Sequence, residues 1–250
     1  MKKTPPLVSI LIPVYNGQMH LTQAIQSILS QKFTNLELIA VDDASKDKSW
    51  KILNRFKALD KRVRVYKNLN HYGLSKTLNT AIRKARGEFI AFMTQESRSY
   101  VDRIGKQVSY LLSNPQIAAA GTQSAFVDEE GKVVSRSSYP TDPSKIEENL
   151  LSQNSLLFES FMINKKALPK DLLKFGEEDY PLLHSTLLMK ICKYSKIANL
   201  DTSLMFYRLS SQIESNNKFL IAKFIANLRV WLAAFLLHDY RPSFRSLFTF

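Results

Sequence analysis

Short apolar runs alternate with segments of helical periodicity along the first hundred residues. The runs are rich in β-branched and aromatic residues and span residues 8–14, 36–41, 62–66 and 88–93. Between them, apolar residues recur every three or four positions over residues 18–31, 48–59 and 74–85. This alternation predicts right-handed βαβ units and a parallel sheet. Because the runs are almost continuously apolar, we expect strands that are buried on both faces.

The pattern changes after residue 100. Residues 100–113 predict a helix that ends before Pro115, and residues 117–138 predict a hairpin around the acidic turn 128–131. Helical periodicity returns over 143–152 and 178–192, and a strand-like run lies near 203–207. After about residue 210 the sequence becomes a long apolar and basic stretch.

The 250 residues are enough to bury a sizeable core, but the chain is strongly basic, with a net charge of +13 and a pI near 9.7. Such an excess attracts nucleic acid, anionic lipid headgroups or phosphorylated small molecules. A merely soluble basic surface is the alternative. No basic-aromatic reader motif is present, so we expect no nucleic-acid partner.

Cys192 is the single cysteine, which excludes an internal disulfide and favours a reducing compartment. It lies in an apolar helical stretch, so we expect a buried thiol. The N-terminal apolar run is short, follows Pro5 and Pro6 and lacks a small-residue cleavage site, which argues against a signal peptide. No uninterrupted run approaches the roughly 20 apolar residues of a membrane-spanning helix. We expect a cytoplasmic protein, with peripheral attachment to the inner membrane face as an alternative.

Polar side chains follow two of the predicted strands, at the edge where open α/β sheets bind ligands. After Pro13, Tyr15 could stack on a base, and Asn16 could cap the next helix; capping alone would explain Asn16 but not Tyr15. Asp42 and Asp43 close the next strand. One of these two carboxylates can serve the turn while the other accepts a hydrogen bond from a ligand N–H; a solvated turn is the alternative.

The stretch FIAFMTQESRS, residues 89–99, ends a further predicted strand with hydroxyls, amides and the carboxylate of Glu96. It is either a site for a metal or a phosphate, or a polar turn. No G-x-G-x-x-G or G-x-x-x-x-G-K motif follows any strand, which counts against a dinucleotide-binding Rossmann domain and a P-loop NTPase. Phosphates would then meet a metal or basic side chains such as Lys76, Arg98 and Arg103.

The segments VSILIPVYNG, SILSQ, LELIAVDDASKDKS, NLNHYGLSKTLNTAIRKARGEFIAFM and NPQIAAAGTQ together resemble the nucleotide-sugar-binding half of glycosyltransferase family 2. The resemblance continues through GEEDYPLL to FYR and covers roughly residues 7–210. It implies an α/β GT-A fold over residues 1–210, with a mostly parallel central sheet, a Rossmann-like nucleotide-binding half at 7–100 and an acceptor half at 101–210. A helical segment at 211–250 would follow.

The resemblance also implies a reaction. The donor would be a nucleoside diphosphate sugar, and the acceptor a glycan or a lipid-linked molecule of cell-surface polysaccharide biosynthesis. The base and ribose pocket would consist of Pro13, Tyr15, Asp42 and Asp43, with Asp43 the partner of a uracil or thymine imide. Lys76 and Asn79 would lie on a helix that faces the phosphates.

Glu178 and Asp179 match the acidic pair of the family. By this resemblance Asp179 is the general base that takes the acceptor proton, and the transfer inverts the anomeric centre. A helix-start acid stabilised by the helix macrodipole is the alternative for Asp179.

Three departures from the family pattern leave alternatives for the expected activity. The usual acidic D-x-D or D-D cluster, which holds Mn²⁺ or Mg²⁺ on the diphosphate, is replaced at 94–97 by Thr, Gln, Glu and Ser, so that Glu96 is the one carboxylate left. A divalent cation is often held by one or two carboxylates with phosphate oxygens and water, so Glu96 could suffice. Phe158 and Glu159 replace a usual His-Pro, and the helix after Asp179 lacks a common aromatic-arginine pattern. A metal-assisted enzyme, a metal-independent enzyme and an inactive nucleotide-binding or scaffold relative are the three alternatives.

The segment 211–250 combines a wide apolar face with basic residues. This composition suits an anionic membrane surface. Packing against the rest of the chain, or against a second protomer in a homodimer, is the alternative. His184 and His238 have no partners at metal-ligand spacing, and we expect both to be structural.

Overall fold

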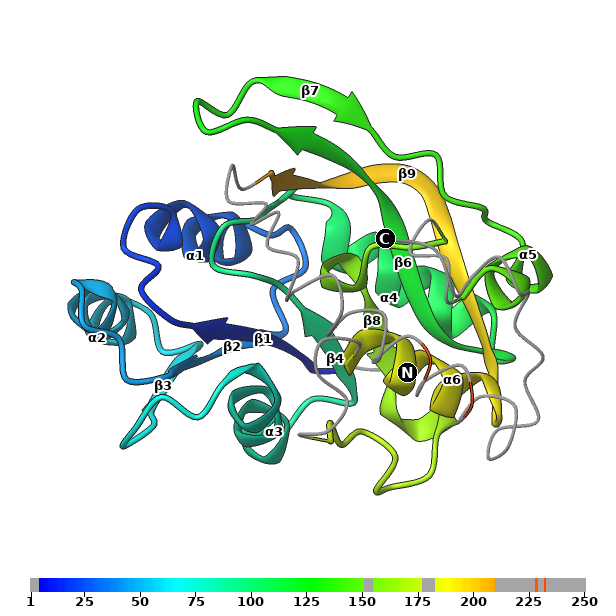
Figure 1. Cartoon of the computed structure of the whole chain (residues 1–250), viewed down its shortest axis with the longest axis horizontal. Coiled ribbons are helices and arrows are strands. Elements are labelled where there is room, and N and C mark those ends of the chain that lie inside the picture. Colours follow the sequence, from blue (N-terminus) through cyan, green and yellow to red (C-terminus); the bar gives the residue numbers. More distant parts are fainter. Residues whose placement is uncertain (1–4, 151–154, 177–182, 210–227, 229–231, 233–250) are drawn as a thin grey trace.

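The computed structural model describes residues 5–150, 155–176 and 183–209, together with Leu228 and Leu232 (Figure 1). Over these residues the chain forms one mixed sheet of nine strands, in the order β3-β2-β1-β4-β8-β6-β9-β5, with β7 paired to β6. Helices cover both faces of the sheet (Figure 1). The predicted α/β class is therefore confirmed.

The first half of the sheet is parallel. It comprises β1 (Val8–Val14), β2 (Leu36–Asp42), β3 (Val63–Lys67) and β4 (Phe89–Phe92), connected by α1 (Leu21–Leu29), α2 (Ser49–Leu59) and α3 (Leu74–Lys84). The alternation of apolar runs and helical periodicity predicted these elements. Because the four strands run in one direction, their carboxyl ends meet at one edge of the sheet.

The strands β1, β2 and β4 are buried on both faces, as their apolar character predicted, whereas β3 alternates buried valines with partly exposed Arg64 and Tyr66. Leu11 of β1 lies in a core shared with α3 and α6 (Leu183–Cys192), whereas Ile10 and Ile12 lie in a second core shared with α1, α2 and α4 (Arg103–Ser113). The Cys192 thiol packs at the edge of the first core, and burial raises its pKa to about 12. This thiol is therefore protonated at neutral pH, in agreement with a structural role.

The second half of the sheet is mixed. The long strands β6 (Ile117–Val127) and β9 (Lys196–Arg208) pair in parallel, while β5 (Arg98–Ser99), β7 (Val133–Arg136) and β8 (Met162–Asn164) pair antiparallel to their neighbours. The helices α5 (Pro143–Glu148), η1 (Phe158–Ser160) and η2 (Lys165–Ala167) complete this half. The β6–β7 pairing confirms the predicted hairpin. The strands β5 and β8 were not predicted, and the run near 203–207 is part of the longer β9.

Several predictions fall outside the described residues. They concern Asp179, with the start of its helix, and the segment 211–250, apart from Leu228 and Leu232, which are helical. Among the described helices, none has both the length and the apolar character that crossing a membrane requires. The division of the chain into domains stays a prediction.

Candidate active site

A cavity of about 640 Å³ opens at the carboxyl edge of the parallel strands. Its walls come from the residues that follow β1, β2 and β4 and from the start of α3. The lining residues are Pro13, Val14, Tyr15, Asp43, His71, Tyr72, Gly73, Leu74, Ser75, Thr77, Thr94, Gln95 and Glu96. This volume is typical of a small-molecule site.

Four of the predicted site residues line this cavity, namely Pro13, Tyr15, Asp43 and Glu96. They come from three strand ends that are up to 83 residues apart in sequence, from Pro13 to Glu96. Their contacts with a ligand stay a prediction, but the fold brings them to one place.

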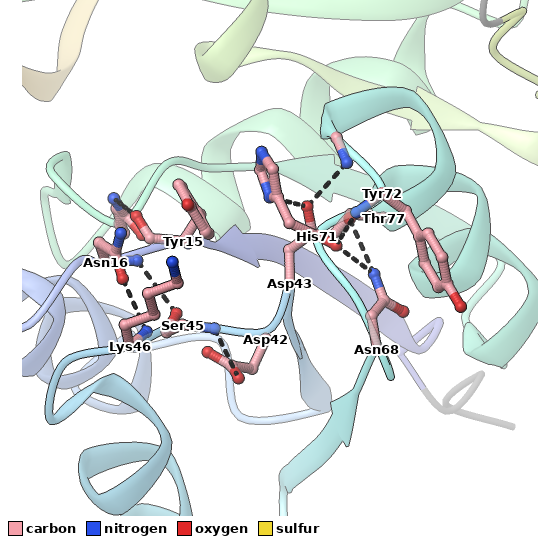
Figure 2. A network of polar contacts seen from close by, with 12 residues as sticks. Tyr15, Asn16, Asp42, Asp43, Ser45, Lys46, Asn68, His71, Tyr72 and Thr77 are labelled. Atoms are coloured by element: carbon pink, nitrogen blue, oxygen red, sulfur yellow. Dashed lines mark hydrogen bonds and ion pairs between the residues drawn. The ribbon is translucent and has the colours of Figure 1, made fainter.

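The carboxylate of Asp43 holds the loop that leads into α3 (Figure 2). Its Oδ1 accepts hydrogen bonds from Asn68 Nδ2 at 2.6 Å and from the Tyr72 amide at 3.0 Å. Its Oδ2 accepts one from the Gly73 amide at 2.8 Å and lies 2.8 Å from His71 Nδ1. Asp43 therefore fixes one wall of the cavity, and each of its two oxygens has two partners in this loop.

These contacts also set the charge of Asp43. Burial alone would raise its pKa, but the hydrogen bonds from Asn68 and from the amides of Tyr72 and Gly73 more than offset this, so that the pKa lies below the ordinary value of 3.8. The cavity therefore contains a fixed negative charge at neutral pH.

We expect the Asp43→Asn variant to be less stable than the wild-type protein by about 2 kcal/mol at pH 7. The NH2 group that replaces one carboxylate oxygen cannot accept the hydrogen bonds that this oxygen accepts from N–H groups. A lowered folded-state pKa contributes stability above the unfolded pKa, and this contribution is lost as the pH falls. The difference between the two proteins should therefore shrink below about pH 4. Urea unfolding of both proteins at pH 7 and at pH 3.5 measures this difference in stability.

The exposed Asp201→Asn variant is the control and should unfold like the wild-type protein. A stability difference for Asp43→Asn that is independent of pH would contradict the assigned charge.

The loops after β1 and β2 are bound to each other (Figure 2). The Asn16 amide donates to Ser45 Oγ at 3.0 Å, and Asn16 Oδ1 accepts from the Lys46 amide at 2.9 Å. Asn16 has a φ of 49°, in the left-handed region that asparagine tolerates well. Its side chain therefore joins two strand ends; the start of α1 at His20 has no side-chain cap, and the predicted cap of α1 by Asn16 is wrong.

Gln95 fixes the backbone of Tyr15. Its Oε1 accepts from the Tyr15 amide at 2.9 Å, and its Nε2 donates to the Tyr15 carbonyl at 3.0 Å. Gly17 makes room for this contact, since a Cβ there would lie 2.3 Å from Gln95 Oε1. Gln95, one of the four residues that replace the usual acidic cluster at 94–97, thus has a structural function that the sequence did not reveal.

Glu96 is the carboxylate of this cavity that is available to a cation. Among the lining residues the carboxylates are Asp43 and Glu96, and Asp43 is engaged by its loop. Within the described part of the chain, Glu96 has no recorded hydrogen bond or ion pair, and no cluster of three or more His, Cys, Asp or Glu residues could hold a metal by itself. A divalent cation here would have Glu96 as its protein ligand and would need further oxygens from a bound diphosphate and water.

Three predicted residues do not line the cavity. Asp42 is fully buried behind it and accepts a hydrogen bond from the Ser45 amide, so it serves the turn. Asn79 uses both ends of its amide on the backbone of Phe175, at 2.8 and 2.9 Å, in place of the predicted phosphate contact. The Lys76 ammonium lies 5.7 Å from the ring centroid of Tyr72, beside a cavity residue.

The prediction that Arg103 contacts phosphate is wrong. Arg103 is fully buried, and its guanidinium donates to the Phe92 carbonyl, to Ser99 Oγ and to Gln107 Oε1 at 2.9–3.1 Å. Burial lowers its pKa to about 9, which leaves it charged at neutral pH. Arg98, the other predicted arginine, lies over the ring of Phe206 and outside the cavity lining.

A further carboxylate, Glu159 of η1, lies outside the cavity lining but acts electrostatically on Tyr207, as Glu96 does, and was not predicted as part of the site. Its negative charge is the main cause of a raised pKa at Tyr207, with burial and the charge of Glu96 adding to the shift. Burial also raises the pKa of Glu159 itself.

The expectation that His184 is structural agrees with its position, stacked on Phe158 with the ring centroids 3.8 Å apart.

The comparison with solved structures gives the fold. A mannosyltransferase from Pyrobaculum calidifontis, PcManGT, solved in complex with GDP-Man and Mn²⁺, superposes with a TM-score of 0.67 at 17% identity, covering 93% of this chain and 65% of that chain. The chain therefore has the GT-A fold of glycosyltransferases, as the sequence predicted.

The family follows from the sequence comparisons. Residues 9–170 match the family model described as Glycosyl transferase family 2. An uncharacterized glycosyltransferase of Haemophilus influenzae is 32% identical over 227 residues, covering 89% of this chain and 87% of the relative. The chain belongs to glycosyl transferase family 2. An Escherichia coli relative, UDP-Glc:alpha-D-GlcNAc-diphosphoundecaprenol beta-1,3-glucosyltransferase WfgD, is 29% identical over 226 residues, covering 85% of this chain and 81% of the relative.

Proposed function

We propose that this chain transfers a sugar, with inversion, from a nucleoside diphosphate sugar to a glycan or lipid-linked acceptor of cell-surface polysaccharide biosynthesis. The observation that carries the proposal is the cavity that brings an aromatic ring, Tyr15, and two carboxylates, Asp43 and Glu96, to one edge of the sheet. WfgD, with a nucleotide-sugar donor and a lipid-linked acceptor in its name, supports the donor and acceptor classes. A lipid-linked acceptor would place the reaction at the inner membrane face.

Each of these residues has a role that suits the chemistry of its side chain. Tyr15 offers a ring on which a nucleobase stacks, and Asp43 offers a carboxylate that accepts a base N–H. Glu96 would hold a divalent cation, Mn²⁺ or Mg²⁺, on the diphosphate; the mannosyltransferase complex with GDP-Man and Mn²⁺ supports the use of a divalent cation. When bound, the cation neutralises charge on the departing diphosphate. Asp179 would take the proton of the acceptor hydroxyl as that oxygen attacks the anomeric carbon.

Nucleotide binding tests this function directly. We expect UDP, GDP or dTDP to raise the unfolding temperature of the protein, and to raise it further when Mn²⁺ is present. A ligand at a hundred times its Kd stabilises the folded state by about 2.7 kcal/mol, which a thermal-shift measurement resolves. No shift with any of the three nucleotides would contradict the proposal.

The same measurement separates the alternatives. Stabilisation by a nucleotide that is indifferent to Mn²⁺, accompanied by sugar transfer, would support the metal-independent enzyme. Stabilisation without transfer or donor hydrolysis would support the inactive nucleotide-binding or scaffold relative.

A further inference from the structure

His71 makes the two contacts that the proposed function assigns to a nucleobase (Figure 2). Its ring stacks on Tyr15, with the centroids 3.9 Å apart and the planes inclined by 23°. Its Nδ1 lies 2.8 Å from Asp43 Oδ2. A flat aromatic ring on Tyr15 with an N–H directed at Asp43 is the arrangement expected of a bound base.

Of the four groups bound to Asp43, His71 is the one that a ligand can replace most easily. Tyr72 and Gly73 contribute main-chain amides, and Gly73 has a φ of 84° that fixes the turn. Asn68 contributes a buried side chain that is also bonded to Thr77. The His71 side chain, by contrast, is 52% exposed, so it can rotate into solvent while the other three bonds to Asp43 stay intact.

We propose that His71 occupies the nucleobase position of the cavity when no donor is bound, and leaves it when a nucleotide binds. This inference rests on the proposed function. It makes His71 an internal competitor of the donor, so the apparent affinity for a nucleotide is the intrinsic affinity multiplied by the fraction of molecules whose base position is open. A diphosphate without a base does not compete with the imidazole, and its affinity is independent of His71.

The His71→Ala variant tests this competition. Titration calorimetry with UDP, GDP and dTDP, in the presence of Mn²⁺, compares it with the wild-type protein. If His71 fills the position in 90% of molecules, its removal lowers the Kd of the nucleotide about tenfold. Inorganic pyrophosphate, used as the probe without a base, should bind both proteins equally. The control is Leu69→Ala, in the same loop, because Leu69 is 89% exposed and lies outside the cavity lining; it should bind nucleotides like the wild-type protein.

A second measurement follows the imidazole itself. The ring-proton signals of His71 in the wild-type protein should move toward the values of an unstacked histidine when UDP is added, and should stay in place when pyrophosphate is added. Signals that keep their stacked position in the nucleotide complex would overturn the inference.

The two proposals fail in different ways. If the wild-type protein binds a nucleotide and His71→Ala binds it equally or more weakly, His71 is not a competitor and the inference alone fails. If neither protein binds any of the three nucleotides, the proposed function fails as well.

Discussion

We expect the Glu96→Gln variant to lose about a hundredfold or more of its sugar-transfer rate, together with the additional stabilisation that Mn²⁺ gives to nucleotide binding. Glutamine keeps the length of the side chain and one oxygen that can accept a hydrogen bond, but it removes the charge that a divalent cation requires. A cation on the departing diphosphate would supply several kcal/mol of stabilisation to the transition state, which corresponds to at least a hundredfold in rate. Initial rates of transfer at several Mn²⁺ concentrations measure the effect.

The matched control for this change is Glu130→Gln, in the exposed turn between β6 and β7. It removes the same charge from the protein as a whole and should leave both the rate and the dependence on Mn²⁺ unchanged. Glu159→Gln tests the other carboxylate that acts electrostatically on Tyr207. If Glu159→Gln loses all dependence on Mn²⁺ while Glu96→Gln keeps it, the metal ligand is Glu159 and not Glu96.

The Asp179→Asn variant is expected to show the largest loss of activity. General-base catalysis contributes about 10²- to 10⁴-fold, and asparagine cannot take up the acceptor proton. Because the proposed base acts on the acceptor, the affinity for UDP, GDP or dTDP should stay that of the wild-type protein. Transfer rates and nucleotide titrations on the same preparation separate the two effects.

Glu178→Gln provides the comparison, since it alters the other member of the same acidic pair. It should retain most of the activity. If Glu178→Gln abolishes transfer while Asp179→Asn does not, the base is Glu178. The anomeric configuration of the product, read by NMR, tests the single displacement, and a product that retains the configuration of the donor would contradict it.

The parallel half of the fold was predictable from local sequence. The apolar runs of β1, β2 and β4 are long enough to show their character, and each is followed by polar residues at the same edge. The strands β5 and β8 have only two and three residues, too few to show a period. The register of β9 shifts several times against β6, which hides its full length from an alternation pattern.

The candidate site was predicted in part, and its limits have a physical reason. Position at a strand end was enough to place Tyr15, Asp43 and Glu96 at the cavity. The direction of a side chain depends on partners far away in sequence, and these are not visible in a local pattern. Asn79 faces Phe175, 96 residues later, and the guanidinium of Arg103 faces Phe92, behind the cavity. His71 was not predicted as a site residue, because nothing in the sequence around it indicates a ring stacked on Tyr15.

The contact between Gln95 and Tyr15 has a consequence for any attempt to redesign this protein toward the usual acidic motif. An aspartate at position 95 is one methylene shorter and has no N–H group, so it could not donate to the Tyr15 carbonyl. Gln95→Asp would add a second charge for a cation but would loosen the backbone that presents the Tyr15 ring. Stronger metal binding and a firmly held stacking platform are therefore competing demands on this one position.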